Sequence, residues 1–505
     1  MGEQMRTKFL ERVAMFVSLL VLGALLWYTL QLGLVRYFDA DELAYLHWAH
    51  NVFIGERPYY DFFSYVPSGF MYVLAPLFLF VKGAEILTLA RWFAFLVELG
   101  MVICLIVIYK NWRGSFFGIV AAIVFLFLPI PQDKLIEVRP DNLAMLIGLM
   151  GLISQIRLIE FQKQRSAFWA GLFYGLSLII LPKTLPHVVF AAAITLLWWR
   201  EDWKNRWVYV REFIVGGITP VVVFVLFQLV TAKSMAELST LLYSLTKLPF
   251  EVNRIAEQFF MQPDLFFYPN SIYYGVGGVH AGLIANHALW LLGLLFGVYR
   301  LFTPFVPNGK KGMFTELLLS GSFFIYVATF ILWYPMRHAQ YLIPIALFVS
   351  LYVADGIEQA WKKAKTHTVY KGVFWAFSVV SIVFGWQIYL TVTMPKMAMT
   401  NREDMRVIYQ SQHMIPKESY VLDFVGSTIY FRDPYYVSAL PFGQYPSYLS
   451  RPLPTLSRIL SHTNTPYIYE GRLDRMQTLS IEDQVYIRMH YIPLEATHFW
   501  KAKGL

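Results

Sequence analysis

The sequence predicts an all-α polytopic membrane protein with about 11–13 transmembrane helices and a small α/β extracytoplasmic domain at the C-terminus. Of its 505 residues, 57% are hydrophobic and 15% are charged, whereas soluble proteins carry about 25% charged residues. Several apolar runs reach or approach the roughly 20 residues needed to cross a bilayer. After about residue 395 the composition changes to a mixture of Tyr, Pro, Gly and charged residues.

The charge and the cysteine content narrow the class further. The net charge of +9 does not indicate nucleic-acid binding, because Lys and Arg gather in the cytoplasmic loops of membrane proteins. We therefore expect membrane lipids, and no nucleic acid, among the partners. A single cysteine, Cys104, excludes an intrachain disulfide. The first apolar run has no small-residue cleavage site, which favours a retained span over a signal peptide.

Basic segments alternate along the chain with segments that are poorer in Lys and Arg. If the basic ones are cytoplasmic, the loops 36–66, 131–141, 182–187, 231–283 and 334–338 and everything after about 395 are external. This alternation predicts spans near 12–35, 86–109, 115–130, 141–157, 166–181, 187–200, 207–230, 284–303, 312–333, 339–355 and 371–394.

The apolar segment 67–83 breaks this alternation, because counting it as a span would place the basic residues 110–114 outside. It is short and contains Pro76, so we expect a juxtamembrane or re-entrant helix on the external face. The alternative is a full span with a second, unrecognised crossing nearby. The chain then divides into a transmembrane domain, residues 1–394, and an extracytoplasmic domain, residues 395–505, in which "YVLDFVG" and "PYIYEG" are typical of strands.

Three acids crowd the start of the first external loop, "RYFDADELAY". Asp39 and Glu42 stand three residues apart before a helical pattern, which predicts an N-terminal capping box. This structural explanation does not cover Asp41, whose placement most needs a functional reason. Ionisable residues at membrane depth indicate a functional site by default.

Other ionisable residues on the external loops have simple structural interpretations. Asp133 and Lys134 fit a solvated loop, His47 and His50 fit a helix surface or interface, and Lys183 fits snorkelling to lipid headgroups. Asp141 could cap the span that it precedes. Arg337 and His338 are different, because basic residues outside depart from the loop-charge rule.

The order of the loop motifs resembles the GT-C class of membrane glycosyltransferases. The first loop matches through Asp41, Glu42, Tyr45, Gly55, Pro58, Tyr59, Asp61 and Pro67. "EVRPDNLAML" looks like the second loop of that class, and "LPKTLP" and "YPMRHAQYLIPI" look like two later basic elements. The match runs in order over about residues 36–345. It is closest to the branch with the protein O-mannosyltransferases and the lipid A aminoarabinose transferases.

The resemblance implies a donor sugar on a polyprenyl phosphate and an acceptor hydroxyl that attacks the anomeric carbon with inversion. The acceptor would be a lipid, a polysaccharide or a protein. Asp41 would be the general base, and cationic groups would hold the departing phosphate. The candidates for phosphate binding are Lys183, Arg337, His338 and Arg139. The candidates for orienting the substrate or binding a metal are Asp141, Glu42, Asp61, Tyr45 and Tyr341.

Several alternatives stay open at this level. Some relatives of this fold use a divalent metal such as Mg²⁺ or Mn²⁺ and others do not.

The active site would face the external, periplasmic side of a bacterial or archaeal plasma membrane. An oligosaccharide transferase or polysaccharide polymerase would use similar loops. A lipid-linked sugar transporter or flippase would instead bury charges at mid-membrane, often with Gly- or Pro-broken spans in matching halves. The sequence shows no such pairing, and its acids lie at the ends of the spans.

Overall fold

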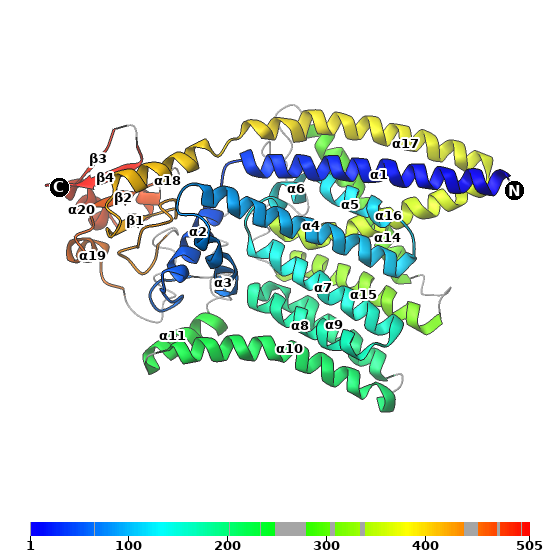
Figure 1. The fold of residues 1–505 in the computed structure, drawn as a ribbon, viewed down its shortest axis with the longest axis horizontal. Helices are drawn as coiled ribbons and strands as arrows, with labels where there is room; N and C mark the ends of the chain where they lie inside the picture. The colour runs from blue at the N-terminus through cyan, green and yellow to red at the C-terminus, as the bar shows by residue number, and fades with distance from the viewer. Residues whose placement is uncertain are drawn as a thin grey trace.

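The computed structural model describes residues 2–64, 66–200, 203–232, 234–247, 279–302, 309–333, 339–438, 453–471, 475–495 and 497–504. Its long helices follow the longest dimension of the molecule, and the two termini lie at opposite ends (Figure 1). Helices α2 (Ala40–Phe53) and α3 (Gly69–Leu74) lie at the end that carries the C-terminal sheet (Figure 1). We call this end the polar end.

Every predicted span coincides with a helix. These helices are α1 (Gly2–Val35), α4 (Glu85–Arg113), α5 (Gly118–Phe127), α7 (Pro140–Phe161), α8 (Gln164–Ile180), α9 (Leu185–Arg200), α10 (Trp203–Thr231), α14 (Val279–Phe302), α15 (Gly309–Ala328), α16 (Ile343–Thr366) and α17 (Thr368–Ile388). Within the described residues, seven helices are long and apolar enough to cross a membrane by length and composition alone. The prediction of an all-α polytopic membrane fold is confirmed.

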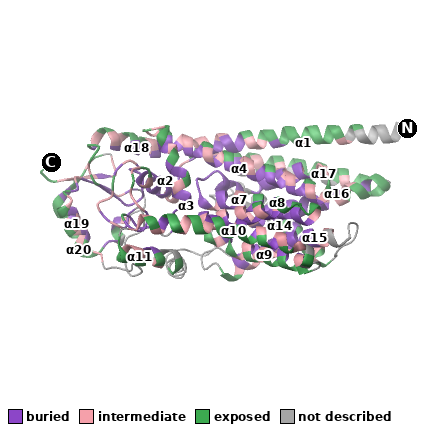
Figure 2. Ribbon diagram, turned by 60° about the horizontal axis from the view of Figure 1, so that its bottom comes forward, coloured by how far each residue is buried: buried purple, intermediate pink, exposed green. Residues whose placement is uncertain are grey.

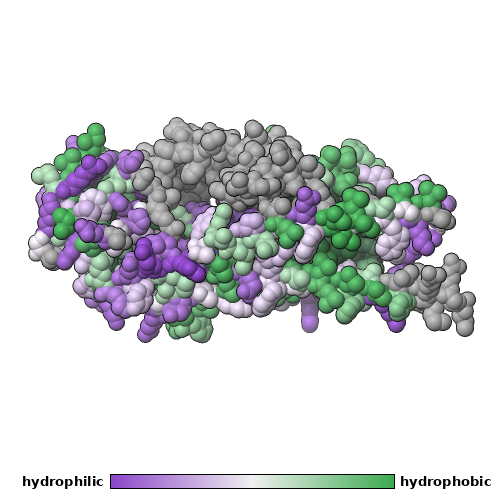
Figure 3. Space-filling view, turned by 90° about the horizontal axis from the view of Figure 1, so that it is seen from above, coloured by the Kyte–Doolittle hydropathy of each residue, from purple (hydrophilic) through white to green (hydrophobic). Residues whose placement is uncertain are grey.

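The outer surface of the bundle has the character that a lipid environment requires. Residues 11–21 of α1 and most of the described side chains of α17 are exposed (Figure 2), and they include Phe16, Leu20 and Trp375. Hydrophobic side chains gather over the helical bundle, whereas hydrophilic ones gather around the C-terminal part (Figure 3). Exposed apolar surface of this extent is stable only against lipid or another apolar surface.

The segment 67–83 forms a short broken helix. Helix α3 continues directly into the 3₁₀-helical turn Ala75–Leu79. Eleven helical residues rise about 17 Å, well short of the roughly 30 Å hydrocarbon core. A Cβ atom added to Gly69 would lie 2.5 Å from the carbonyl oxygen of Ile179, so α3 rests directly on the end of α8. The segment therefore does not span the bundle, as the charge alternation predicted.

The C-terminal part is α/β, as predicted. Four strands, β1 (Val421–Asp423), β2 (Tyr467–Tyr469), β3 (Tyr491–Pro493) and β4 (Phe499–Ala502), form one sheet in the order β1-β2-β4-β3. Strands β1 and β2 are parallel, and the other two pairs are antiparallel. Helices α18 (Arg402–Met414), α19 (Leu456–His462) and α20 (Ile481–His490) accompany the sheet. The buried core runs without a break from this sheet into α2 and the helical bundle.

Candidate active site

Helix α2 begins with the predicted capping box. The Asp39 carboxylate accepts a hydrogen bond from the backbone N–H of Asp41 at 3.0 Å, and the Glu42 carboxylate accepts one from the backbone N–H of Asp39 at 3.0 Å. This reciprocal arrangement satisfies backbone donors that a helix start leaves unpaired. It also fixes the direction in which the Asp41 side chain leaves the first turn.

Glu42 has a second role as a link between three segments. It is fully buried, and its oxygens also accept from the Arg91 guanidinium of α4 at 2.9 Å and from the backbone N–H of Val138 at 2.7 Å. These contacts tie the first and second predicted loops together. They support a role for Glu42 in positioning the loops rather than in contacting substrate.

Arg139 joins the two loops at Asp41. Its guanidinium donates to the Asp41 carboxylate at 3.0 Å, lies 3.4 Å from the Asp39 carboxylate and pairs with Glu137. Arg139 is buried, whereas the Asp41 side chain keeps 40% of its accessible surface. Asp41 is therefore the most accessible acid of this cluster and the one best placed to meet a substrate.

The two aspartates of the first loop differ in acidity. Asp41 keeps one face open to water, but the protein around it removes part of its solvation, and this desolvation raises the pKa of Asp41 above its ordinary value, against the opposing attraction of Arg139. Burial acts in the same sense on Asp39, but the charges of Arg139 and Lys134 outweigh it and hold the pKa of Asp39 below its ordinary value. Asp41 is thus the stronger base of the two.

A second group of charged residues surrounds Asp39 and Asp41. Asp133 lies 2.8 Å from Arg36 and 3.2 Å from Lys396, and Lys134 lies 2.8 Å from Glu137 and 3.5 Å from Asp39. All of these side chains except Asp39 are buried. The simpler interpretation of Asp133 and Lys134 as a solvated loop was therefore wrong, because helix α6 (Pro129–Leu135) turns both side chains into the protein.

The whole cluster is electrically balanced. It contains five cations and five acids, namely Arg36, Arg91, Lys134, Arg139 and Lys396 with Asp39, Asp41, Glu42, Asp133 and Glu137. Buried charges are tolerated when they are paired in this way.

Four further predicted residues lie near Asp41, one on α2 itself and three on other elements. Tyr45 lies one turn after Asp41 on α2, Asp141 lies in the first turn of α7, and Lys183 lies in the 3₁₀ helix Pro182–Thr184. The Lys183 ammonium donates to the hydroxyl of Tyr341 and lies 3.9 Å from the centre of its ring. Asp41 and Asp141 both lie within electrostatic reach of Lys183 and Tyr341.

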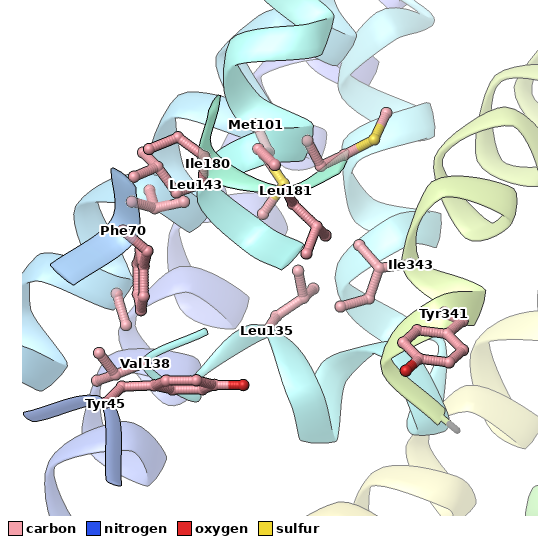
Figure 4. Close-up of a cluster of buried hydrophobic side chains, with 14 of the residues drawn as sticks. Tyr45, Phe70, Met101, Leu135, Val138, Leu143, Ile180, Leu181, Tyr341 and Ile343 are labelled. Carbon is pink, nitrogen blue, oxygen red and sulfur yellow. The ribbon is translucent and has the colours of Figure 1, made fainter. Parts of the chain in front are cut away.

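Figure 4 shows the surroundings of Tyr45 and Tyr341. Their hydroxyl groups point toward the space between them, near Leu135, and the buried apolar side chains of Phe70 and Ile343 lie above them in this view. Burial lowers the pKa of Lys183, against the opposing attraction of Asp141 and Asp41. Polar groups from α2, the loop that carries Arg139, α7 and the 3₁₀ turns at Lys183 and Tyr341 thus lie near one another at the polar end.

The remaining predicted residues fall elsewhere. Asp61 accepts hydrogen bonds from Arg57, which also pairs with Glu237 of α11 (Met235–Thr246), and it does not join the cluster. Arg337 and His338 lie outside the described residues, as does most of the predicted loop 231–283.

The described acids Asp39, Asp41 and Glu42 of the site are each paired with an arginine. Among the described residues, no group of three or more His, Cys, Asp or Glu side chains is arranged to hold a metal ion. Asp39 and Asp41 both contact the Arg139 guanidinium, so a divalent metal would compete with Arg139 for these carboxylates.

Three residues of the cluster were not predicted from the sequence, namely Arg36, Arg91 and Lys396. Arg91 carried a usable signal, since a cation inside the apolar run "LTLARWFAFL" needs a buried partner. Lys396 follows α17, and only the tertiary fold brings it to Asp133.

No protein-family model and no curated protein matches the chain. Solved structures do resemble it. ArnT from Cupriavidus metallidurans bound to undecaprenyl phosphate has a TM-score of 0.60 at 11% identity, with 97% of this chain and 97% of that chain covered. The same protein in the apo state has a TM-score of 0.59 at 13% identity, with 97% and 98% covered.

An oligosaccharyltransferase from Archaeoglobus fulgidus, tethered with an acceptor peptide, has a TM-score of 0.53 at 12% identity. This match covers 94% of the present chain and 72% of the longer oligosaccharyltransferase. Identities this low establish the fold alone. The chain therefore has the membrane fold of the GT-C class, as the order of its loop motifs indicated.

Proposed function

We propose that this protein is an integral membrane glycosyltransferase that moves a sugar from a polyprenyl-phosphate donor to an acceptor hydroxyl. The observation that carries the proposal is the meeting of Asp41, Asp141, Arg139, Lys183 and Tyr341 at one end of the bundle. The fold adds support, because a solved structure with this fold holds undecaprenyl phosphate.

In the proposed reaction, Asp41 is the general base. The acceptor oxygen attacks the anomeric carbon, its proton passes to the Asp41 carboxylate, and the bond from that carbon to the phosphate oxygen breaks. The bonding electrons leave with the polyprenyl phosphate, and the configuration inverts. A carboxylate whose pKa lies above its ordinary value accepts the proton more readily than an ordinary aspartate would.

Arg139 and Lys183 have different roles in this proposal. Arg139 already contacts three carboxylates, so we assign it to holding Asp41 in place. Lys183 and Tyr341 lie across from Asp41 and suit the phosphate of the donor, which gains negative charge as the bond breaks. Arg337 and His338 stay predicted phosphate ligands. Asp141 would orient the donor or the acceptor.

The polar end would face the outside of the cell, because the basic loops lie at the opposite ends of the same helices. A donor with a long apolar tail would then enter from the outer leaflet. A second candidate function follows from the likeness to an oligosaccharyltransferase. With this second function, the protein would transfer a preassembled glycan, whereas in our proposal it transfers a single hexose or pentose.

The proposal is tested in cells that lack the protein. Mass spectrometry of their envelope glycolipids, polysaccharides and proteins is compared after complementation with the wild type, Asp41→Asn or Glu403→Gln. We expect one sugar residue to be lost from one acceptor, and we expect the wild type and Glu403→Gln to restore it. Glu403 is the control, because it is an acid of α18 that pairs with Arg406 outside the cluster.

Asp41→Asn should restore less than about 1% of the product, since a general base contributes roughly 10²–10⁴-fold. Purified Asp41→Asn should still bind undecaprenyl phosphate as the wild type does. Restoration by Asp41→Asn would refute its role as the base. Loss of a whole oligosaccharide would favour the second candidate function.

A further inference from the structure

The loop after strand β1 is shaped by one buried acid. The Asp423 carboxylate accepts hydrogen bonds from the backbone N–H groups of Val425 at 2.7 Å, Gly426 at 2.7 Å and Thr428 at 2.6 Å. It is fully buried at the end of the strand. These bonds fix the loop "DFVGST" in a turn whose tip is Gly426.

This loop tip lies directly on helix α2. Gly426 has a φ of +90°, and a Cβ atom added there would lie 2.9 Å from the Cα atom of Ala44 and 3.0 Å from its nitrogen. Only glycine allows both the backbone conformation and the close approach. Ala44 lies about one helical turn after Asp41, the base of the proposed function.

A second contact lies one turn further along α2. His47 pairs with Asp433, and their side chains are 0% and 4% exposed. The next residues of the same segment also hold the first loop. The backbone N–H of Phe63 donates to the carbonyl of Tyr436 at 2.7 Å, and the Tyr436 hydroxyl donates to the carbonyl of Tyr59 at 2.6 Å.

We infer that the C-terminal segment 423–436 is a positioning element for Asp41, acting through helix α2. The helix is held from two sides. Glu42 ties its first turn to α4 and to the second loop, and the segment 423–436 holds it at Ala44 and His47. With both supports in place, Asp41 stays within hydrogen-bond distance of Arg139. The inference rests on the proposed function for the role of Asp41, but the bracing of α2 is independent of it.

The test compares Gly426→Ala with Gly504→Ala in the full-length protein. Gly504 also has a positive φ, +93°, but nothing lies within 4 Å of a Cβ atom added there. The control therefore carries the backbone strain without the contact. Hydrogen exchange of residues 40–53 is measured first. We expect about tenfold faster exchange of α2 in Gly426→Ala and no change in Gly504→Ala or in α7.

Transfer activity is measured next as a function of pH. We expect kcat of Gly426→Ala to fall about 10- to 100-fold, since a displacement of about 1 Å has effects of this size. Binding of undecaprenyl phosphate should be unchanged. The acid limb of the profile should move to higher pH, because Asp41 loses part of its contact with Arg139. If the variant only reduced the fraction of folded protein, kcat would fall by the same factor at every pH, and the acid limb would stay at its wild-type pH.

Asp433→Asn is a second variant, which keeps the number of non-hydrogen atoms unchanged. It removes the charge opposite His47, whose pKa is raised to about 9 because Asp433 outweighs the effect of burial. We expect the same changes on a smaller scale, so this variant decides the question if Gly426→Ala does not fold. Unchanged exchange of α2 in both variants would overturn the bracing. Faster exchange with an unmoved acid limb would overturn the positioning of Asp41. An inactive wild type with a braced α2 would instead count against the proposed function.

Discussion

Replacement of Arg139 by glutamine tests the central interaction of the site. Arg139 is 3% exposed and contacts Asp39, Asp41 and Glu137. Breaking a buried ion pair by removing one partner costs about 3–5 kcal/mol. We expect a loss near 3 kcal/mol, because Lys134 still pairs with Glu137 at 2.8 Å and Asp41 is accessible to water.

The matched control is Arg57→Gln. Arg57 also contacts two carboxylates, those of Asp61 and Glu237, but it is 21% exposed. Ion pairs accessible to water contribute about 0–1 kcal/mol, so we expect this variant to unfold almost as the wild type does. Unfolding of both variants in mixed detergent micelles measures the difference. Equal stability of the two variants would refute the view that the cluster is a buried network.

Arg139→Gln also separates two roles for the arginine in the proposed reaction. If Arg139 holds Asp41, the kcat of transfer falls while binding of undecaprenyl phosphate is kept. The acid limb of the pH profile also moves up, because the arginine favours the charged carboxylate. If Arg139 binds phosphate instead, the affinity for undecaprenyl phosphate falls and the limb stays in place.

Three further predictions follow from the geometry. In the wild type, kcat/KM should fall with acidification at a pH above the ordinary aspartate pKa of about 3.9, because the raised pKa of Asp41 protonates the base earlier; a limb at or below that value would contradict the assignment. Lys183→Ala should weaken undecaprenyl phosphate binding at least about tenfold, and Lys183→Arg should restore part of it; equal binding by all three proteins would remove Lys183 from the phosphate site. Gly171→Ala should destabilise the fold by about 1–3 kcal/mol or more, since its Cβ atom would lie 2.0 Å from the Phe213 carbonyl oxygen, whereas Gly23→Ala, with nothing within 4 Å, should unfold like the wild type.

The sequence predicted the parts of this protein that depend on local patterns. The spans follow from hydrophobic runs, and their connection follows from the positions of Lys and Arg. The capping box of Asp39 and Glu42 follows from a three-residue spacing that places the two side chains at one helix start. The non-spanning segment after Pro67 follows from its length and from the charge parity of its neighbours.

The contacts that build the site join residues that are far apart in the sequence. Glu42 meets Val138, which is 96 positions away, and His47 meets Asp433, which is 386 positions away. Glu42 and His47 each have a local explanation, as part of a capping box and as a helix-surface or interface residue. No pattern in the sequence links either of them to its distant partner. The burial of Asp133 and Lys134 likewise depends on tertiary packing, here of α6 against α5, α16 and α4.

The charge balance of the cluster bears on where the phosphate of a donor would bind. Five cations face five acids, so the cluster has little net charge to offer an incoming anion. A phosphate placed against Arg139 would have to displace Asp39 or Asp41 from it. Lys183 hydrogen-bonds to the uncharged hydroxyl of Tyr341 and is attracted by Asp141 and Asp41 across the site. As the bond to the sugar breaks, the added negative charge on the phosphate would favour a fully charged Lys183, against the burial that lowers its pKa. Attraction to the donor would then be strongest in the transition state, which is where an enzyme gains rate from it.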